Sequence, residues 1–173
     1  MTAACLWIDR VSSPIGEILV VTDDAALVVI EFADKEARMT PHLARYFKGV
    51  ELVPRVDPLG MSGRLQNYFE GELSAFDGAP VDPAGDGFQR KVWLALREIP
   101  PGETISYGAL AARLDNPTAS RAVGMANSRN PIGIVLACHR VIGANGALTG
   151  YAGGLARKTW LLRHEGALPR ALL

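Results

Sequence analysis

The part of the sequence best suited to covalent chemistry is Cys138-His139-Arg140, which directly follows an apolar run ending at Ala137. A cysteine is nucleophilic only as its thiolate, and basic or cationic neighbours lower the thiol pKa from its usual value of about 8.5. His139 could accept the thiol proton directly or through a water, and a carboxylate on the far ring nitrogen would fix the imidazole tautomer. Glu165 is the candidate carboxylate. This combination predicts nucleophilic attack by the Cys138 sulfur.

A structural role is the simpler interpretation of Cys138, because free cysteine is among the most buried residue types and neighbours in a strand point to opposite faces. The other cysteine, Cys5, lies in an apolar segment without polar neighbours and is predicted to belong to the core. Two cysteines are too few for a disulfide framework. His42 and His164 have no partners at metal-ligand spacing, so we expect no metal.

Length and composition bound the class of protein. The chain has 173 residues, of which 49% are hydrophobic and 21% charged, as in a folded protein of one ordinary domain or two small ones. No apolar run approaches the roughly 18–20 residues of a membrane helix, and residues 1–7 do not resemble a secretion signal. We therefore expect a cytoplasmic protein with no membrane partner.

The net charge of zero conceals two oppositely charged halves. Residues 1–87 carry 7 Lys and Arg against 14 Asp and Glu, a net charge of −7, whereas residues 88–173 carry 11 against 4, a net charge of +7. Such asymmetry is typical of a surface for nucleic acid or another anionic partner in one half, although two ordinary domains with different surfaces would show it too.

The first half predicts a small antiparallel β-sheet with helices. Apolar, β-branched runs separated by turn residues predict strands at Ala4–Val11, Glu17–Thr22 and Ala26–Phe32. Helical spacing follows around 35–48, then a proline-containing loop at 53–58 and a helix at Ser62–Phe69. Glycine and proline concentrate in residues 71–87, which coincide with the charge boundary. We expect a supporting domain at 1–80 and a second domain at 86–173.

The second half predicts mostly helices. Asp86 is a candidate N-cap for a helix that ends at Ile99, before Pro100-Pro101-Gly102. Helices predicted at Ser106–Leu114 and Ala119–Ser128 flank a tight turn. Such a pair is typical of a helix-turn-helix unit and equally of an ordinary αα-hairpin.

Seven segments, in order, resemble the O6-alkylguanine-DNA alkyltransferases, also called methylated-DNA–protein-cysteine methyltransferases. They are Phe88–Trp93, Pro101–Tyr107, Ala119–Gly124, Asn130-Pro131, Cys138–Gly143, Thr149–Gly154 and Lys158–Gly166. The resemblance covers essentially all of residues 86–166, and the first half looks like the family's more variable N-terminal domain. It implies an α/β (α+β) fold, with a ribonuclease-H-like N-terminal domain and a mostly helical C-terminal domain containing a helix-turn-helix.

The resemblance also implies a reaction, in which the cysteine irreversibly takes an alkyl group from O6 of a damaged guanine in double-stranded DNA, without a cofactor. Carried over by position, Cys138 is the alkyl acceptor, His139 activates it through a water, and Glu165 orients His139. Asn130 would support the active-site turn, and Tyr107 would protonate N3 of the leaving guanine and press on the adjoining phosphate. O4-alkylthymine remains open as a second substrate.

The resemblance further implies DNA contacts from the helix pair, which in this family enters the minor groove. The base must leave the stack to reach the thiol, and Arg121 would fill the gap it leaves. Small residues would allow close approach to the sugar-phosphate walls. The expected DNA contacts are Arg121, Tyr107, Ala122, Gly124 and Ser106, and the expected lining of the base pocket is Tyr151, Ala152, Gly153 and Val141. We expect a monomer and leave cooperative binding on DNA open.

Two positions depart from the family pattern. Ala137 stands where most relatives have proline, which removes a fixed φ and restores an amide donor. Arg129 stands where a small residue is common in relatives, which would add either a phosphate contact or only a solvated charge. Two other classes of function stay in view. One is a lesion-binding module like the alkyltransferase-like proteins, which lack the cysteine, and the other is a Cys-His hydrolase unrelated to DNA. Cys138 argues against the first, and the second leaves the charge asymmetry and the helix pair unexplained.

Overall fold

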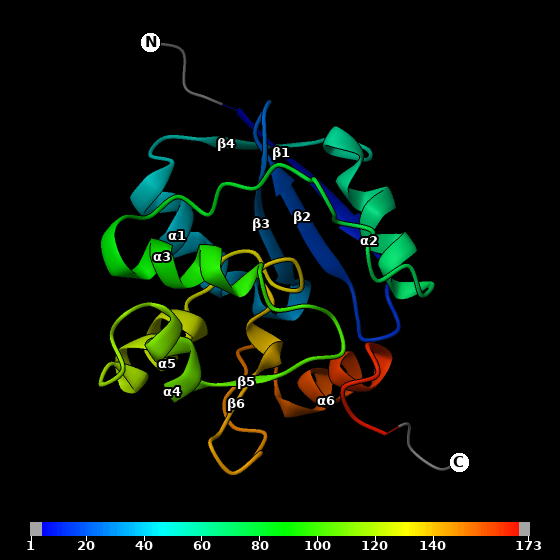
Figure 1. The fold of residues 1–173 in the computed structure, drawn as a ribbon. Helices are drawn as coiled ribbons and strands as arrows, with labels where there is room; N and C mark the ends of the chain where they lie inside the picture. The colour runs from blue at the N-terminus through cyan, green and yellow to red at the C-terminus, as the bar shows by residue number, and fades with distance from the viewer. Residues whose placement is uncertain (1–4, 170–173) are drawn as a thin grey trace. The chain divides into compact units, whose positions relative to one another are not determined.

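The computed structural model describes residues 5–169 and divides the chain into two compact units, Met1–Ala84 and Gly85–Leu173 (Figure 1). Each unit has its own small sheet and its own helices. The described part of the chain contains no helix with the length and apolar character needed to cross a membrane.

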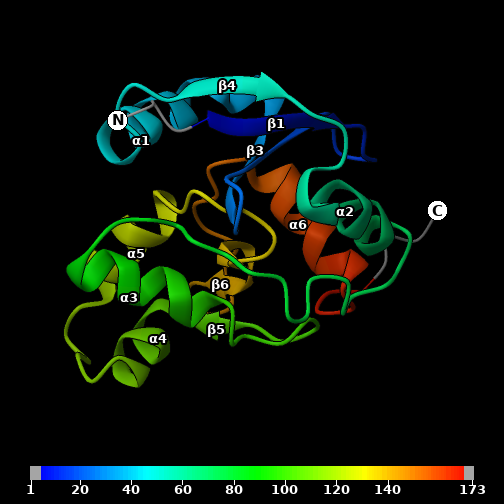
Figure 2. The same cartoon turned by 90° about the horizontal axis from the view of Figure 1, so that it is seen from above.

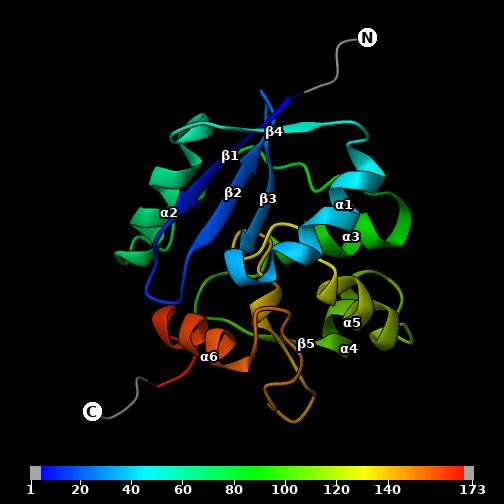
Figure 3. The ribbon, with the colours of Figure 1, turned by 180° about the vertical axis from the view of Figure 1, so that it is seen from behind.

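The N-terminal unit is built on a four-stranded sheet with the order β3-β2-β1-β4. Strands β1 (Cys5–Val11), β2 (Ile18–Thr22) and β3 (Leu27–Phe32) form the antiparallel meander predicted from their β-branched runs (Figure 3). The first predicted strand residue, Ala4, lies outside the described residues. The prediction that Cys5 belongs to the core was wrong, because Cys5 is exposed at the start of β1. Every residue of β2 and β3 is buried, and the two strands are accordingly apolar except for Thr22 and Glu31.

The fourth strand corrects the sequence prediction. Strand β4 (Glu51–Pro54) pairs parallel to β1, with Leu52 opposite Leu6, so the sheet is mixed and not purely antiparallel (Figure 2). The predicted loop at 53–58 thus begins too early, since Val53 and Pro54 belong to β4. Proline is tolerated here because β4 is an edge strand, and the side of β4 that faces away from β1 has no neighbouring strand that needs a hydrogen-bond donor.

Helices complete the N-terminal core. The predicted helical region around 35–48 is a 3₁₀-helix, η1 (Ala33–Arg38), followed by α1 (Met39–Tyr46). Side chains from α1 pack with Leu6, Leu19 and Val28 of the sheet. After a short 3₁₀-turn, η2 (Pro58–Gly60), helix α2 (Met61–Phe69) lies against β1 and buries Leu65 and Tyr68.

The C-terminal unit is mostly helical, as predicted. Helix α3 (Gly87–Leu96) begins directly after Asp86, whose side chain makes no capping hydrogen bond. The helix ends three residues earlier than predicted, and the chain continues to Ile99 in turns, in which the Glu98 and Ile99 N–H groups donate to the Ala95 and Leu96 carbonyls. Strands β5 (Ile105–Ser106) and β6 (Val141–Ile142) form a short parallel pair, and α6 (Leu155–His164) closes the unit.

The two short helices predicted around a turn are α4 (Tyr107–Arg113) and α5 (Ser120–Ser128), which pack together. Ser106 caps α4, since its hydroxyl accepts a hydrogen bond from the Ala109 N–H at 3.0 Å. Helix α3 packs on α5, and the buried Trp93 Nε1 donates to the Ala126 carbonyl at 2.8 Å. This bond fixes α5 to α3.

Candidate active site

Cys138 begins the 3₁₀-turn η3 (Cys138–Arg140), at the end of an irregular loop that Asn130 holds together. The buried Asn130 side chain accepts from the Ile132 N–H at 3.0 Å and donates to the Leu136 carbonyl at 2.6 Å. Because one amide side chain bonds both ends of residues 132–136, it fixes the path of the chain into Cys138.

Two three-residue turns lie within this loop. The Val135 N–H donates to the Gly133 carbonyl at 2.8 Å, which puts Ile134 at a φ of 72°. A positive φ is unfavourable for a β-branched residue, so this turn is strained. In the second turn the Cys138 N–H donates to the Leu136 carbonyl at 2.7 Å, and Ala137 has φ −78° and ψ 65°, the inverse γ-turn conformation. Both turns set the direction of the chain at the thiol.

His139 is fully buried and pairs with Glu165, the residue at the C-terminal cap of α6. Its Nε2 lies 2.9 Å from Glu165 Oε1. An ionised carboxylate only accepts hydrogen bonds, so we assign the imidazole proton to Nε2 and leave Nδ1 as an acceptor. Nδ1 is buried and has no hydrogen-bond partner within the described part of the chain. The imidazole of the residue after Cys138 is thus oriented as a proton acceptor.

Glu165 is also bound by Arg140, which holds both carboxylate oxygens. Arg140 Nε donates to Oε1 at 2.8 Å and Nη2 to Oε2 at 2.7 Å, while Nη1 donates to the Ile99 carbonyl. Burial raises the pKa of Glu165, but the hydrogen bonds and positive charge of Arg140, together with His139, outweigh it and hold that pKa far below its ordinary value. Glu165 therefore stays ionised while buried.

Burial favours the neutral form of the His139 imidazole. Burial lowers the pKa of His139 below the ordinary value of 6.5, although the charge and hydrogen bond of Glu165 oppose this shift. Arg140 and Lys158 lower the pKa further. Near neutral pH the imidazole is therefore neutral, the state that can take a proton from a thiol.

Lys158 is fully buried on α6 and bonds three backbone carbonyls of the neighbouring loop. Its Nζ donates to Val141 O at 2.6 Å, Thr149 O at 2.9 Å and Gly150 O at 3.4 Å. Burial lowers the pKa of Lys158, and the nearby Cys138 acts in the opposite direction. The ammonium group thus joins residues 141 and 149–150 beside the thiol.

Tyr107, the first residue of α4, reaches the same loop. Its hydroxyl donates to the Thr149 carbonyl at 3.2 Å, the same oxygen that Lys158 bonds. Burial raises the pKa of Tyr107, and the proximity of Cys138 contributes in the same direction. Because its pKa is raised, the phenol stays protonated and can donate a hydrogen bond near the sulfur.

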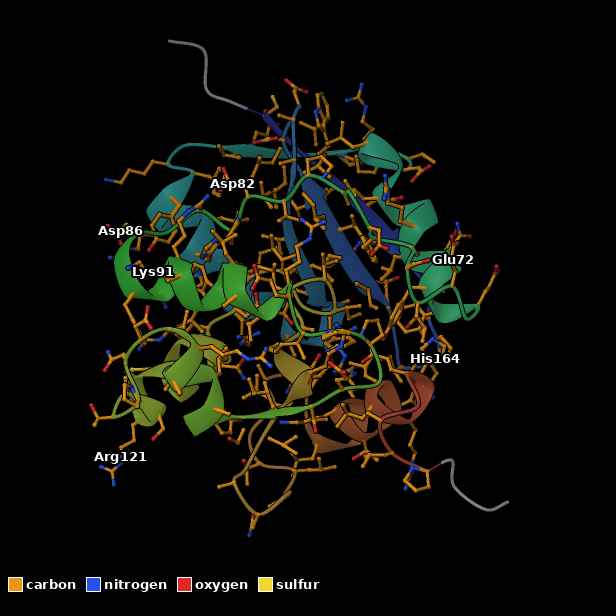
Figure 4. All side chains as sticks on the ribbon, in the orientation of Figure 1. Glu72, Asp82, Asp86, Lys91, Arg121 and His164 are labelled. Atoms are coloured by element: carbon orange, nitrogen blue, oxygen red, sulfur yellow. The ribbon has the colours of Figure 1, made fainter. Side chains whose placement is uncertain are left out.

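The remaining predicted site residues fall into two groups. Val141 is buried, and Tyr151, Ala152 and Gly153 form the turn before α6, in which the Gly154 N–H donates to the Tyr151 carbonyl at 2.9 Å. Arg121 and Ala122 are exposed on α5, and the Arg121 side chain projects outward from the helix (Figure 4). Gly124 faces Tyr107, since an added Cβ would lie 3.7 Å from the Tyr107 ring.

Three residues with contacts in the site had no predicted role of their own. Arg140 was considered only as a cation beside Cys138, Lys158 only as part of a motif, and Asn127 not at all. Asn127 Nδ2 donates to the Cys138 carbonyl at 3.4 Å. A signal existed for Lys158, because it shares the buried face of α6 with Leu161, Leu162 and Glu165, where a lysine needs a partner.

Comparison with known proteins identifies the family. Residues 87–167 match the family model described as the 6-O-methylguanine DNA methyltransferase DNA binding domain, and residues 10–83 match the ribonuclease-like domain of the same family. The chain belongs to the 6-O-methylguanine DNA methyltransferase family. A methylated-DNA–protein-cysteine methyltransferase of Salmonella typhimurium is 48% identical over 163 residues, covering 92% of this chain and 95% of the relative.

Solved structures of methyltransferases agree in fold. The O6-methylguanine methyltransferase of Mycobacterium tuberculosis superposes with a TM-score of 0.79 at 38% identity, covering 96% of both chains. The OGT protein of the same organism, in complex with DNA, gives a TM-score of 0.80 at 39% identity, covering 94% of this chain and 93% of that one. The predicted α/β fold, with a ribonuclease-like N-terminal part, is thereby confirmed.

Within this methyltransferase, Ala137 keeps a backbone that proline can adopt. Its φ of −78° is close to the proline value, and no hydrogen bond from its N–H is found among residues 5–169. We expect Ala137→Pro to raise the free energy of unfolding by about 0.4–1 kcal/mol, because proline restricts the unfolded chain. Urea denaturation measures this.

The matched control is Ala147→Pro in the same unit, which removes the N–H that donates to Asn145 Oδ1 at 3.1 Å and is expected to destabilise. A lower unfolding free energy for Ala137→Pro than for the natural chain would contradict the interpretation of this turn.

Among the described residues, no group of three or more His, Cys, Asp or Glu side chains could hold a metal ion. The polar side chains near Cys138 bond one another and backbone carbonyls: His139 and Arg140 bond Glu165, Lys158 bonds the Val141 carbonyl, and Tyr107 bonds the Thr149 carbonyl. These side chains can together accept a proton, hold a charge and donate a proton, which are the steps of an alkyl transfer to sulfur.

Proposed function

We propose that this chain repairs double-stranded DNA by transferring the alkyl group of O6-alkylguanine to Cys138, once per molecule. The observation that carries the proposal is the buried pair formed by His139, which directly follows Cys138, and Glu165. Family membership and the relatives named methylated-DNA–protein-cysteine methyltransferase support the same reaction. O4-alkylthymine, which also carries an alkyl group on oxygen, is a second candidate substrate.

The transfer proceeds from the contacts around the thiol. Nδ1 of His139 takes the Cys138 proton, directly or through a water, and the ionised Glu165 stabilises the imidazolium formed. The sulfur attacks the alkyl carbon, a C–S bond forms, and the carbon–O6 bond breaks with its electron pair remaining on the guanine. Tyr107 protonates the leaving base at N3, and its phenolate takes back the proton that His139 received from the thiol, so that one thiol proton in total is transferred to guanine.

DNA binding is assigned to the C-terminal unit, which contains the basic half of the chain and the matched DNA binding domain. We infer that Arg121 fills the stack when the damaged base flips out, with Ala122 and Gly124 allowing close approach. Ser106 would act by positioning α4, which it caps. Tyr151, Ala152, Gly153 and Val141 are the proposed lining of the base pocket.

The N-terminal unit would then be a supporting domain, whose acidic surface limits nonspecific binding to DNA. The proposed protein works as a monomer without a cofactor. A cytoplasmic location fits the chemistry, because a nucleophilic thiol requires a reducing compartment.

Intact-mass spectrometry tests the proposal directly. After mixing with a duplex containing O6-methylguanine, we expect the protein to gain one methyl group per chain, and the Cys138→Ser variant to gain none. Cys5→Ser is the matched control and should react like the natural chain, since Cys5 lies in β1 of the other unit. No mass gain, or a gain that survives Cys138→Ser, would exclude Cys138 as the acceptor.

A further inference from the structure

Helix α5 presents an exposed face with a large apolar side chain at its centre. Arg121, Ala122, Met125, Ser128 and Arg129 are all exposed and follow one another at helical spacing. Met125 is 58% exposed, which makes it one of the few large hydrophobic side chains of the described residues on the surface. Val123, Ala126 and Asn127, on the opposite face, are buried.

The charge on this face has one sign. Arg121 and Arg129 stand two helical turns apart, about 12 Å along the axis, and Met125 lies midway between them. Residues 116–131 contain no Asp or Glu. The Ser128 hydroxyl donates to the Met125 carbonyl at 2.7 Å, so that it does not compete with the arginines for an anionic partner. A methionine between two cations, on a segment without acidic side chains, fits a polyanion that also offers an apolar surface.

We infer that Met125 enters the minor groove of DNA and makes apolar contact with sugars and base edges, between Arg121, which fills the stack, and Arg129, which binds a phosphate. This assignment rests on the proposed function and adds a contact that the sequence analysis did not assign. Methionine suits the position, because it is unbranched and flexible, and apolar side chains of this type act as wedges in the minor groove. Contacts of this kind do not depend on base sequence, which suits lesions that arise anywhere.

The two kinds of contact differ in their response to salt. A cation that neutralises a phosphate releases counterions and contributes about 0.9 to the slope of log K against log salt concentration. An apolar contact releases none. Met125 should therefore contribute affinity without contributing to the slope, whereas Arg129 should contribute to both.

The experiment measures binding of the full chain to an unmodified fluorescent DNA duplex at several KCl concentrations. We expect Met125→Gln to raise the Kd about tenfold at every concentration and leave the slope unchanged, with Met125→Leu close to the natural chain. Arg129→Gln should lower the magnitude of the slope by about 0.9. An unchanged Kd for Met125→Gln, or a slope change as large as that of Arg129→Gln, would overturn the assignment.

A second measurement separates this inference from the proposed reaction. Alkylation of Cys138 by free O6-methylguanine base, which has no groove, should proceed equally in Met125→Gln and the natural chain, whereas transfer from subsaturating duplex should slow. If Cys138 were not alkylated but Met125→Gln still raised the Kd for DNA, the proposed reaction would be refuted and the DNA contact of Met125 would be supported. If the natural chain self-associated, and Met125→Gln abolished this without changing the Kd for DNA, the exposed face of α5 would be assigned to contact with a second copy of the chain.

Discussion

Replacing Glu165 by glutamine is expected to slow alkyl transfer to Cys138 by about 10²–10⁴-fold and to lower the free energy of unfolding by about 3–5 kcal/mol. Glutamine presents an amide in place of a carboxylate, so His139 loses the charge that stabilises its protonated form. Arg140 keeps its own charge but loses both carboxylate partners, and an unpaired buried guanidinium is strongly unfavourable. Single-turnover kinetics and urea denaturation measure the two effects.

Two companion variants separate catalysis from folding. Glu103→Gln, an exposed glutamate of the same unit, should change neither quantity. The double variant Glu165→Gln/Arg140→Met removes the unpaired charge and should recover part of the stability, while transfer stays slow. Recovery of the transfer rate in the double variant would show that Glu165 acts only on the fold.

The pH dependence of stability provides a further check on Glu165. Its pKa in the folded chain lies far below the ordinary value of 4.5, so the folded state binds the proton less readily than the unfolded state. The stability contributed by Glu165 is therefore complete above about pH 4.5 and declines as the pH falls toward the folded-state pKa. The difference in unfolding free energy between the natural chain and Glu165→Gln should narrow over the same range.

Replacing Lys158 by methionine is expected to lower the free energy of unfolding by about 1–3 kcal/mol and to slow transfer by about 10²-fold. Methionine fills a similar volume but has no donor, so the buried Val141 carbonyl and the more exposed Thr149 and Gly150 carbonyls lose a hydrogen bond. Tyr107 also bonds the Thr149 carbonyl, so movement of this loop displaces the phenol relative to the sulfur.

The control for Lys158 is Arg163→Met, on the exposed face of the same helix, which should affect neither stability nor transfer. The reaction with free O6-methylguanine base distinguishes a role of Lys158 in the pocket from a role in DNA binding. Because the loop lies beside the thiol, Lys158→Met should slow the reaction with the free base as well as with the duplex. A loss confined to the duplex would assign Lys158 to DNA contact and contradict this interpretation.

Local patterns in the sequence predicted most of the fold. The strands β1, β2 and β3 follow from β-branched runs, and α4 and α5 follow from capping and turn residues around Asp115, which takes a positive φ of 58°. Strand β4 could not be predicted, because its four residues become a strand only by pairing with β1, more than forty positions away. Such pairing is a property of the assembled sheet and leaves no local pattern.

The candidate site could likewise be predicted only in part. Cys138, His139 and Glu165 could be named from residue types and from resemblance. The structural roles of Arg140 and Lys158 could not, because their partners are carbonyls and a carboxylate supplied by distant segments, such as Ile99 for Arg140. A sequence shows which side chains can donate, and only the folded chain shows which acceptors they meet.

The bond between Trp93 and the Ala126 carbonyl has a practical consequence. Because Trp93 is buried in the C-terminal unit and its indole N–H is bound to α5, its emission depends on where that helix lies. The other tryptophans, Trp7 and Trp160, lie in β1 and α6. A chain that retained Trp93 alone would carry an internal optical probe of α5, in a position that requires no attached dye and leaves the exposed face of the helix untouched.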